Sequence, residues 1–217
     1  MVFDLGEVLT EPPTHLAELA AVMGVDEADF APAYWKRRPA YDEGGPGSVY
    51  WRAVGGDVGV EVDDTLVERL VEVDARAWLT LHPDSVPLLL DVKAAGNGLV
   101  LLSNIPVELA AQVRTRSWSQ NFDLLVFSCD VGAMKPELEI YRAVEQGIAE
   151  LVGLVGLVGH SGHAEDAGQA SAVEPLSLTF FDDRPENVAG AIEAGWRARV
   201  WAGHADARSF LAENGLL

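Results

Sequence analysis

The sequence predicts an α/β protein with a Rossmann-like, doubly wound parallel sheet as its core and an inserted, all-helical cap. Short continuous apolar runs, of the kind found in strands that are buried on both faces, alternate with helical patterns through most of the chain. Such alternation favours a parallel sheet with helices on its two faces. A long stretch of purely helical periodicity separates the first apolar run from the second, and we therefore expect an insertion after the first strand.

The expected strands are short apolar runs, and most of them are followed by a helical pattern. We expect strands at 2–5, 99–102, 124–127, 178–181 and 199–201. We expect the helices of the core at 83–95, from 106 onward, from 137 to about 146, at 186–194 and at 205–213. Gly96 and Gly195 stand where two of these helices should end, as glycine commonly does.

The chain divides into two parts at the ends of the inserted helical stretch. We expect residues 1–11 and 81–217 to form the core and residues 12–80 to form the cap. Within the cap, Asp63 is placed at the start of a long helix, where its side chain can accept a hydrogen bond. Residues 148–172 fit neither pattern, because a repeat of Leu, Val and Gly is followed by a stretch rich in Ser, Gly, Ala and His. We predict that they form a partly mobile insertion within the core.

The composition argues against several classes of function. The chain of 217 residues has 34 Asp and Glu against 15 Lys and Arg, a net charge of −19, which argues against nucleic acid or an anionic membrane as a partner. Its single cysteine, Cys129, excludes an internal disulfide and fits a reducing compartment. The sequence shows no signal-peptide pattern and no apolar run long enough to span a bilayer. We expect a cytoplasmic protein that is a monomer or homodimer.

Polar residues stand at the carboxyl ends of the first, second and fourth expected strands and shortly after the third. They are Asp4, Ser103 with Asn104, Lys135, and Asp182 with Asp183. Each has an ordinary explanation by itself, because serine and aspartate often cap helices and lysine is usually exposed. In a parallel sheet, however, the carboxyl ends of the strands open into one crevice. Polar groups at successive strand ends therefore predict a binding or catalytic site.

Four segments carry a resemblance to a known family. They are residues 2–9 (VFDLGEVL), 101–104 (LLSN), 132–137 (GAMKPE) and 180–188 (FFDDRPENV). In this order and at these spacings, the chain resembles the haloacid dehalogenase (HAD) superfamily, and within it the branch with a helical cap between the first and second motifs. The resemblance covers nearly the whole chain except about residues 148–172.

The resemblance implies a phosphatase that works through a covalent intermediate and Mg²⁺. Asp4 would attack phosphorus and form an aspartyl-phosphate. Carboxylates beside a phosphate dianion repel it, so a divalent cation is needed, and Mg²⁺ suits an all-oxygen site. Asp4 and Asp183 would provide side-chain oxygens to the ion, and Gly6 its backbone carbonyl. Asp182 is a second acidic candidate, but the motif favours Asp183, which has Asn187 four residues on.

The remaining strand ends would bind the phosphoryl group of a small phosphorylated metabolite. The resemblance assigns Ser103 and the neighbouring backbone N–H of Asn104 to the phosphoryl oxygens. Lys135 would neutralise charge on both the nucleophile and the phosphoryl group. Substrate specificity should come from cap residues that close over the site. The candidates, which lie in a predicted polar break of the cap, are Lys36, Arg37, Arg38 and Tyr41.

One position departs from the family pattern. Most phosphatases of the family have a second Asp two residues after the nucleophile, which protonates the leaving group, and this chain has Gly6 there. General acid–base catalysis contributes about 10²–10⁴-fold, so we expect slow turnover or a good leaving group. Some members with Asp-Leu-Gly at this motif resemble sugar-1-phosphate phosphatases, whose leaving groups meet that condition. We expect Glu7 to point away from Asp4 in an extended segment and Gly6 to use a positive φ.

Two other functions are consistent with the same motifs. A 2-haloacid dehalogenase uses the same aspartate to displace halide, but that chemistry needs no metal and would leave Asp182 and Asp183 without a role. A catalytically inactive HAD-like binding protein is favoured by Gly6 in place of the acid. A Mg²⁺-dependent phosphatase accounts for the most residues. Phosphate release measured with and without Mg²⁺ would separate the three functions.

Overall fold

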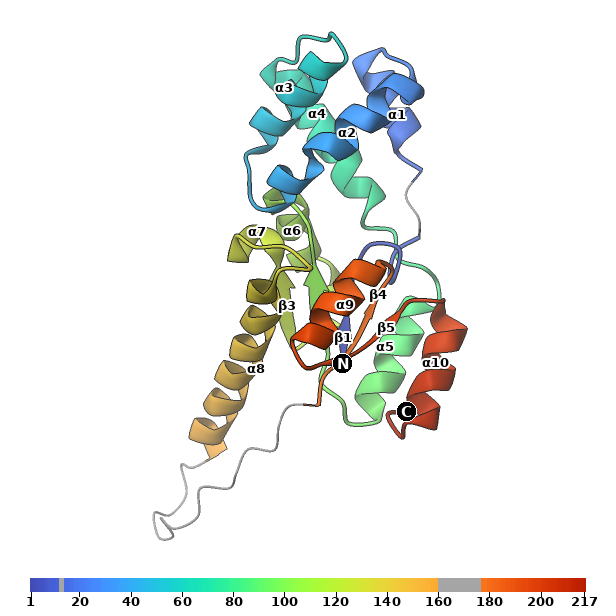
Figure 1. Cartoon of the computed structure of the whole chain (residues 1–217), viewed down its shortest axis with the longest axis vertical. Coiled ribbons are helices and arrows are strands. Elements are labelled where there is room, and N and C mark those ends of the chain that lie inside the picture. The colour runs from blue at the N-terminus through green and yellow to red at the C-terminus, as the bar shows by residue number, and fades with distance from the viewer. Residues whose placement is uncertain (12–13, 160–176) are drawn as a thin grey trace.

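The core of the molecule is a sheet of five parallel strands in the order β3-β2-β1-β4-β5. The strands are β1 (Val2–Phe3), β2 (Val100–Ser103), β3 (Leu124–Phe127), β4 (Thr179–Asp182) and β5 (Arg197–Val200). The computed structural model describes residues 1–11, 14–159 and 177–217 (Figure 1). The predicted doubly wound parallel sheet is confirmed, and β1 lies at its centre between β2 and β4.

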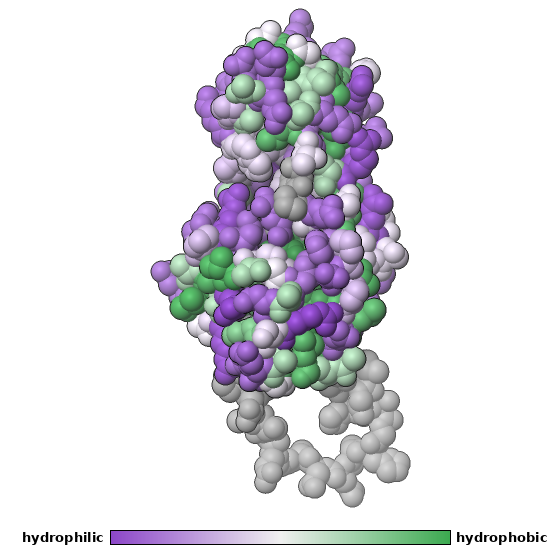
Figure 2. Space-filling model, turned by 90° about the vertical axis from the view of Figure 1, so that its right-hand side faces the viewer, coloured by the Kyte–Doolittle hydropathy of each residue, from purple (hydrophilic) through white to green (hydrophobic). Residues whose placement is uncertain are grey.

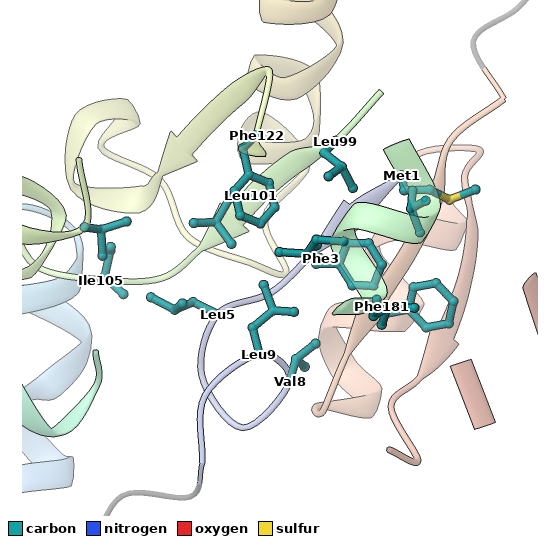
Figure 3. Close-up of a cluster of buried hydrophobic side chains, with 14 of the residues drawn as sticks. Met1, Phe3, Leu5, Val8, Leu9, Leu99, Leu101, Ile105, Phe122 and Phe181 are labelled. Carbon is teal, nitrogen blue, oxygen red and sulfur yellow. The ribbon is translucent and has the colours of Figure 1, made fainter. Parts of the chain in front are cut away.

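Helices cover both faces of the sheet, which explains why the central strands are apolar throughout. The helices of the core are α5 (Ser85–Ala94), α6 (Val107–Arg114), the 3₁₀ helix η1 (Ser117–Asn121), α7 (Ser128–Val131), α8 (Leu138–Gly159), α9 (Pro185–Glu193) and α10 (His204–Glu213). Successive side chains of a strand point to opposite faces. Phe3 therefore joins a cluster with α5, α6 and α10, drawn in Figure 3, where its ring stacks on Phe181 at a centroid distance of 5.3 Å. Val2 joins a second cluster with α8 and α9.

Four helices inserted between β1 and β2 form a separate body beyond the carboxyl ends of the strands (Figure 1). They are α1 (Leu16–Met23), α2 (Glu27–Asp42), α3 (Gly47–Asp57) and α4 (Asp64–Ala77), and we call them the cap. They share a cluster of buried apolar residues that is distinct from those of the core. The side chain of Asp63 accepts a hydrogen bond from Leu66 N at 2.8 Å and so begins α4 as expected.

The two connections between core and cap lie side by side. The backbone N–H of Glu11 donates to the carbonyl of Thr80 at 3.1 Å, and that of His82 donates to the carbonyl of Leu9 at 2.9 Å. The chain therefore leaves the core and returns to it at nearly the same point. The division into a core of residues 1–11 and 81–217 and a cap of residues 12–80 stays a prediction.

Helix α8 is longer than expected. We predicted its end near Gln146 and an insertion at 148–172, but residues 148–159 continue the helix. Ile148 still packs against the sheet, and a repeat of three residues is close to the helical period of 3.6. The prediction was therefore wrong for this part, and residues 160–172 lie outside the described residues.

Helix α2 also differs from the prediction, because the expected polar break within the cap is largely helical. The helix runs to Asp42 and contains Pro39. Arg38 Nε lies 2.7 Å from Asp42 Oδ1, and an ion pair at this i,i+4 spacing stabilises the last turn. Tyr41 is buried in the cap rather than exposed to solvent. The charged run at residues 36–38 thus belongs to a helix and not to the predicted polar break.

Hydrophilic side chains cover much of the surface on the face shown in Figure 2, and the hydrophobic ones form scattered patches there. A polar surface of this kind is expected for a chain with a net charge of −19. Within the described ranges, no helix is long and apolar enough to cross a membrane.

Candidate active site

The carboxyl ends of β1, β2 and β4 meet the cap around a cavity of about 420 Å³. From the core it is lined by Asp4, Gly6, Glu7, Ser103, Asn104, Lys135, Asp183 and Arg184, among others. From the cap side it is lined by Trp35, Arg38, Pro39, Asp42 and Trp78. Asp182 is fully buried next to this group. The structure thus brings together the polar residues that the sequence places near the strand ends.

Asp4 stands where the central strand gives way to a turn. Its backbone N–H donates to the carbonyl of Phe181 at 3.0 Å, which extends the pairing with β4 by one residue. The chain then turns back, and Thr10 N donates to the carbonyl of Leu5 at 3.0 Å. The Asp4 carboxylate is therefore held at the base of the cavity, with little exposure to solvent.

Lys135 lies between two carboxylates. Its Nζ is 2.8 Å from Asp4 Oδ1 and 2.6 Å from Asp182 Oδ2, and it also donates to the carbonyl of Leu102 at 3.1 Å. Asp4 Oδ1 has no hydrogen bond of suitable geometry within the described chain despite its closeness to Lys135. An ammonium group in this position balances part of the negative charge at the strand ends.

The side chain of Asn104 holds Lys135 in place. Asn104 Oδ1 accepts from Lys135 N at 2.9 Å, and Asn104 Nδ2 donates to the Lys135 carbonyl at the same distance. These two bonds lock the loop after α7 onto the end of β2. The Asn104 side chain therefore positions the lysine, and its backbone N–H remains the group that we assign to a phosphoryl oxygen. Ser103 is buried and lines the cavity from the same strand end.

The charges in this group shift one another's pKa values. Burial raises the pKa of Asp4, and the charge of Lys135 opposes this without cancelling it. Burial alone would lower the pKa of Lys135, but the carboxylates of Asp4 and Asp182 outweigh it and raise the pKa. Lys135 is therefore a permanent cation over the ordinary pH range.

The two adjacent aspartates have different surroundings. Asp182 is fully buried, and its Oδ1 accepts from Arg184 N and from Asn187 Nδ2, both at 2.9 Å. Asp183 is half-buried and lines the cavity. Burial, followed by the charges of Asp4 and Asp182, raises the pKa of Asp183 to about 7. Asn187, which stands four residues after Asp183 in the motif, thus donates its side-chain hydrogen bond to Asp182.

Three carboxylates thus converge on one point. One oxygen from each of Asp4, Asp182 and Asp183 lies within 4.8 Å of the others. Carboxylate oxygens are the ligands that Mg²⁺ prefers in proteins. This set of oxygen donors therefore suits a divalent cation.

The positive φ that we expected at Gly6 is found at Glu7 instead. Gly6 has no positive φ, but a Cβ at this position would lie 3.1 Å from Trp78 Cζ3. Glu7 is the non-glycine residue with a positive φ, 56°, among the described residues. It lines the cavity, and its charge contributes to the raised pKa of Asp183. The expectation of an extended segment was wrong because the chain already turns here.

The cap presents Arg38 to the cavity. Its Nε donates to Asp42 Oδ1 at 2.7 Å and its Nη1 to Asp74 Oδ2 at 3.0 Å. Lys36 and Arg37, which we had grouped with it, instead lie at the surface, where their nitrogens approach Asp57 Oδ2 at 3.4 and 2.9 Å. Tyr41, the fourth candidate, stacks on Tyr50 at a ring distance of 4.3 Å within the cap. Arg38 is thus the one of the four that lines the cavity.

The acidic partners of Arg38 differ in their protonation. Burial raises the pKa of Asp42 to about 7 although the charge of Arg38 opposes this. Burial would also raise the pKa of Asp74, but the charge of Arg38 and hydrogen bonds from His15 and Tyr34 outweigh it and lower the pKa. Asp74 is therefore the residue that balances the charge of Arg38.

No pattern in the sequence identified several of the cap residues that line the cavity. Trp35 and Trp78 are aromatic residues near the ends of expected helical segments, and such residues usually belong to the core of a protein. The i,i+4 spacing of Arg38 and Asp42 is the one local pattern that could have identified a charged pair. The contact of Arg38 with Asp74 joins two helices and has no counterpart in the local sequence.

Comparison with known proteins adds evidence on the fold. No protein-family model and no curated protein matches the sequence. A HAD family enzyme from Bacteroides thetaiotaomicron has a similar structure, with a TM-score of 0.67 and 19% identity over 96% of each chain. An aspartate-to-alanine variant of that enzyme, in complex with magnesium and inorganic phosphate, matches with a TM-score of 0.65 and 18% identity over 94% of each chain.

A second enzyme of similar structure catalyses a different reaction. L-2-haloacid dehalogenase from Xanthobacter autotrophicus, with chloropropionic acid covalently bound, matches with a TM-score of 0.65 and 19% identity. The match covers 100% of this chain and 83% of the dehalogenase. Phosphate-binding and dehalogenating enzymes therefore share this fold, and the side chains in the cavity must distinguish between them.

Proposed function

We propose that this chain, whose fold is that of the HAD enzymes, is a Mg²⁺-dependent phosphatase that hydrolyses a small phosphorylated metabolite through an aspartyl-phosphate. The observation that carries the proposal is the convergence of Asp4, Asp182 and Asp183 beside Lys135. Three carboxylates around one ammonium leave an excess of negative charge, which would repel a phosphate dianion. A bound divalent cation offsets that charge. The magnesium and phosphate complex of a structural neighbour supports the proposal.

Asp4, Asp183 and the carbonyl of Gly6 are the groups that we assign to the ion, because they line the cavity. When bound, Mg²⁺ would supply positive charge that stabilises the phosphoryl oxygens in the transition state. Asp182 serves mainly as a support, since its oxygens already bind Lys135, Arg184 N and Asn187.

The protein residues then perform two displacements at phosphorus. A carboxylate oxygen of Asp4 attacks the phosphoryl group, the bond to the leaving oxygen breaks, and an aspartyl-phosphate forms. Ser103 and the backbone N–H of Asn104 bind the phosphoryl oxygens, while Lys135 neutralises their charge. Water hydrolyses the acyl phosphate, which releases inorganic phosphate and restores Asp4. The leaving oxygen takes its proton from solvent, because position 6 has no carboxylate.

A 2-haloacid dehalogenase is the weaker candidate. Displacement of halide needs the nucleophilic aspartate but no cation, so the acidic cluster would have no role. The test is the release of inorganic phosphate from a panel of phosphate esters, and of chloride from 2-chloropropionate, with and without Mg²⁺. We expect phosphate release that requires Mg²⁺. Chloride release that is independent of Mg²⁺, or no release of either ion, would contradict the proposal.

The two adjacent aspartates should respond differently to removal. Asp183→Ala should raise the Mg²⁺ concentration needed for half-maximal phosphate release more than Asp182→Ala does, because Asp183 faces the cavity. Asp182→Ala should instead lower the melting temperature more, because it leaves Lys135 and Asn187 without their shared partner. A larger change in Mg²⁺ requirement from Asp182→Ala would show that the roles are reversed.

The raised pKa of Asp183 predicts how the affinity for Mg²⁺ depends on pH. Asp183 must be ionised to bind a cation, and its pKa is raised to about 7. Protons therefore compete with Mg²⁺ below that pH, and the Mg²⁺ requirement of the wild type should fall as pH rises from 6 to 8. In Asp183→Ala this pH dependence should be much reduced. Equal pH dependence in the two proteins would argue against Asp183 as the ligand.

Restoring an acid at position 6 should change the preference among leaving groups. Gly6→Asp should hydrolyse alkyl phosphates faster than Gly6→Ala does, and the upper limit is the general-acid contribution of about 10²–10⁴-fold. Aryl phosphates should respond less, because their leaving oxygen needs little protonation. Gly6→Ala is the matched control, since both variants place a Cβ against Trp78. The same ratio of alkyl to aryl rates in both variants would show that the carboxylate at position 6 does not act as a general acid, and that Gly6 is needed only because a side chain would crowd Trp78.

A further inference from the structure

We propose that Ser128 is a positioning residue that links the cap to the loop which we assign to the phosphoryl group. Its hydroxyl holds the cap closed by donating to the end of α2, and it turns to an acceptor in the core when the cap opens. Ser128 belongs to none of the four sequence motifs and does not line the cavity. The inference rests on the proposed phosphatase function and adds a residue that couples closure of the cap to the binding of phosphate.

The carbonyl of Asp42 ends α2 and finds its hydrogen-bond partner in the core. The last carbonyls of a helix have no partner within the helix. Those of Pro39, Ala40 and Tyr41 accept from backbone N–H groups of the following turn, each at 3.0 Å. The Asp42 carbonyl instead accepts from Ser128 Oγ at 2.5 Å, across 86 positions of the chain. A core side chain therefore fixes the end of the helix that supplies most of the cap residues lining the cavity.

The hydroxyl of Ser128 has two acceptors within reach but only one proton. Its oxygen accepts from Ile105 N at 2.9 Å, and it lies 2.5 Å from the Asp42 carbonyl and 3.4 Å from the Ile105 carbonyl. The proton goes to the nearer acceptor, which belongs to the cap. When the cap moves away, the hydroxyl can turn to the Ile105 carbonyl while water satisfies the Asp42 carbonyl. Because each group has a partner in both states, the exchange is readily reversed.

Ile105 connects Ser128 to the loop that we assign to the phosphoryl group. It follows Ser103 and Asn104 directly and is buried. Ser103 pairs with Phe127 in the sheet, so that Ser128 follows β3 at the point where this loop follows β2. A phosphoryl group held by Ser103 and the Asn104 N–H would order the loop, and with it the hydroxyl that meets the cap. By linkage, closure of the cap must then strengthen phosphate binding by the same factor.

Cap and core approach each other closely around this contact. In Figure 1, α6 and α7 lie beneath one end of the cap, and the two connections between core and cap lie at its other side. A Cβ at Gly44 would lie only 3.0 Å from the Cys129 carbonyl, and a Cβ at Gly47 only 2.5 Å from Glu108 Oε1. Side chains at these glycines would therefore hold the cap away from α7 and α6.

The same interface contains a feature that opposes closure. Glu108 Oε2 is buried and has no hydrogen-bond partner among the described residues. A buried polar atom without a partner costs free energy, which is recovered when water reaches it. The hydrogen bond of Ser128 favours the closed cap, and the buried Glu108 oxygen favours the open one. Such a balance suits a cap that must close and open in every turnover.

Hydrogen–deuterium exchange without ligand tests the contact itself. The amides of residues 43–45 make the turn that follows α2, and their exchange reports opening at this end of the cap. We expect Ser128→Ala to exchange about two- to ten-fold faster there than the wild type, as for loss of one neutral hydrogen bond. Exchange in α3 and α4 should stay at the wild-type rate, because these helices do not contact Ser128. Equal exchange of residues 43–45 in the two proteins would overturn the inference.

The same measurement with Mg²⁺ and inorganic phosphate tests the coupling. Phosphate should slow the exchange of residues 43–45 in the wild type, because it orders the loop that positions Ser128. In Ser128→Ala the slowing should be smaller, and the dissociation constant of phosphate should be about two- to ten-fold higher. A serine that only supports the fold would leave the effect of phosphate unchanged. Equal slowing in both proteins, or none in the wild type, would overturn the coupling.

A matched control comes from another buried serine of the core. Ser119 is also almost fully buried, but its Oγ donates to the Arg116 carbonyl at 2.8 Å and so stays within its own segment. Ser119→Ala should leave exchange at residues 43–45 and the affinity for phosphate at their wild-type values. If circular dichroism shows that Ser128→Ala is unfolded, Ser128→Cys under reducing conditions decides, because a thiol is similar in size and a weaker donor.

The ligand-free comparison keeps this inference apart from the proposed function. It involves neither phosphate nor turnover, so it decides whether Ser128 holds the cap even if the chain is not a phosphatase. Phosphate release by the wild type together with equal ligand-free exchange in Ser128→Ala would leave the phosphatase standing and overturn the role of Ser128. Absence of phosphate release together with faster ligand-free exchange would overturn the phosphatase and support the contact between Ser128 and the cap.

Discussion

Asp4→Asn is expected to abolish phosphate release while leaving the protein folded. Loss of a nucleophile typically lowers turnover by a factor on the order of 10⁴ or more, because an amide oxygen attacks phosphorus poorly. The side chain is nearly isosteric with aspartate. Lys135 keeps its contact with Asp182 at 2.6 Å, so the variant leaves no buried cation without a partner.

The measurement is phosphate release at saturating Mg²⁺, together with the melting temperature of each protein. Mass spectrometry of acid-quenched wild type should also find phosphate on the peptide that contains Asp4, and this adduct should be absent from the variant. Asp26→Asn is the control, because Asp26 is exposed at the start of α2 and its side chain accepts no hydrogen bond there. Turnover near the wild-type value in Asp4→Asn would exclude the covalent mechanism.

Lys135→Met should produce the largest loss of stability. Removal of one partner from a buried ion pair typically costs about 3–5 kcal/mol, and here one lysine serves two buried carboxylates, Asp4 and Asp182. Methionine keeps the unbranched apolar stem, so the loss reflects charge and not packing. Lys93→Met is the control, because Lys93 pairs with Asp123 near the surface and exposed pairs contribute about 1 kcal/mol or less.

The deficit of Lys135→Met should depend on pH. The pKa of Asp4 is already raised in the folded state, and Lys135 is the charge that holds it down. Without the lysine it rises further, so the folded state binds more protons than the unfolded state, and stability falls as pH rises. Urea unfolding at pH 5 and pH 8 should therefore show a smaller deficit at pH 5. An equal deficit at both values would mean that the carboxylates are not the cause.

The core could be predicted from the sequence because its strands are buried on both faces. Continuous apolar runs identified β1 to β4, and a polar residue ended three of these runs at the same edge of the sheet. The fifth strand was placed about two residues late, at 199–201 and not at Arg197–Val200. It lies at an edge of the sheet with partly exposed side chains, so its apolar pattern is weaker.

On the cap side of the cavity, Arg38 was among the predicted residues, but most of the other lining residues could not be predicted, because their contacts join residues far apart in the chain. Arg38 meets Asp74 across two helices, and nothing in the local sequence predicts this contact. The pairing of Asn187 with Asp182 was missed for a similar reason. Adjacent aspartates look equivalent in a sequence, and the turn after β4 decides which of them faces inward.

The conformation of Glu7 has a consequence for engineering this protein. A left-handed conformation costs a non-glycine residue roughly 1–2 kcal/mol, and Glu7 adopts it with φ 56°. Selection for thermal stability alone would therefore favour glycine at this position and would remove a negative charge from the wall of the cavity. At position 7, thermal stability and the negative charge of the cavity wall therefore cannot both be maximised.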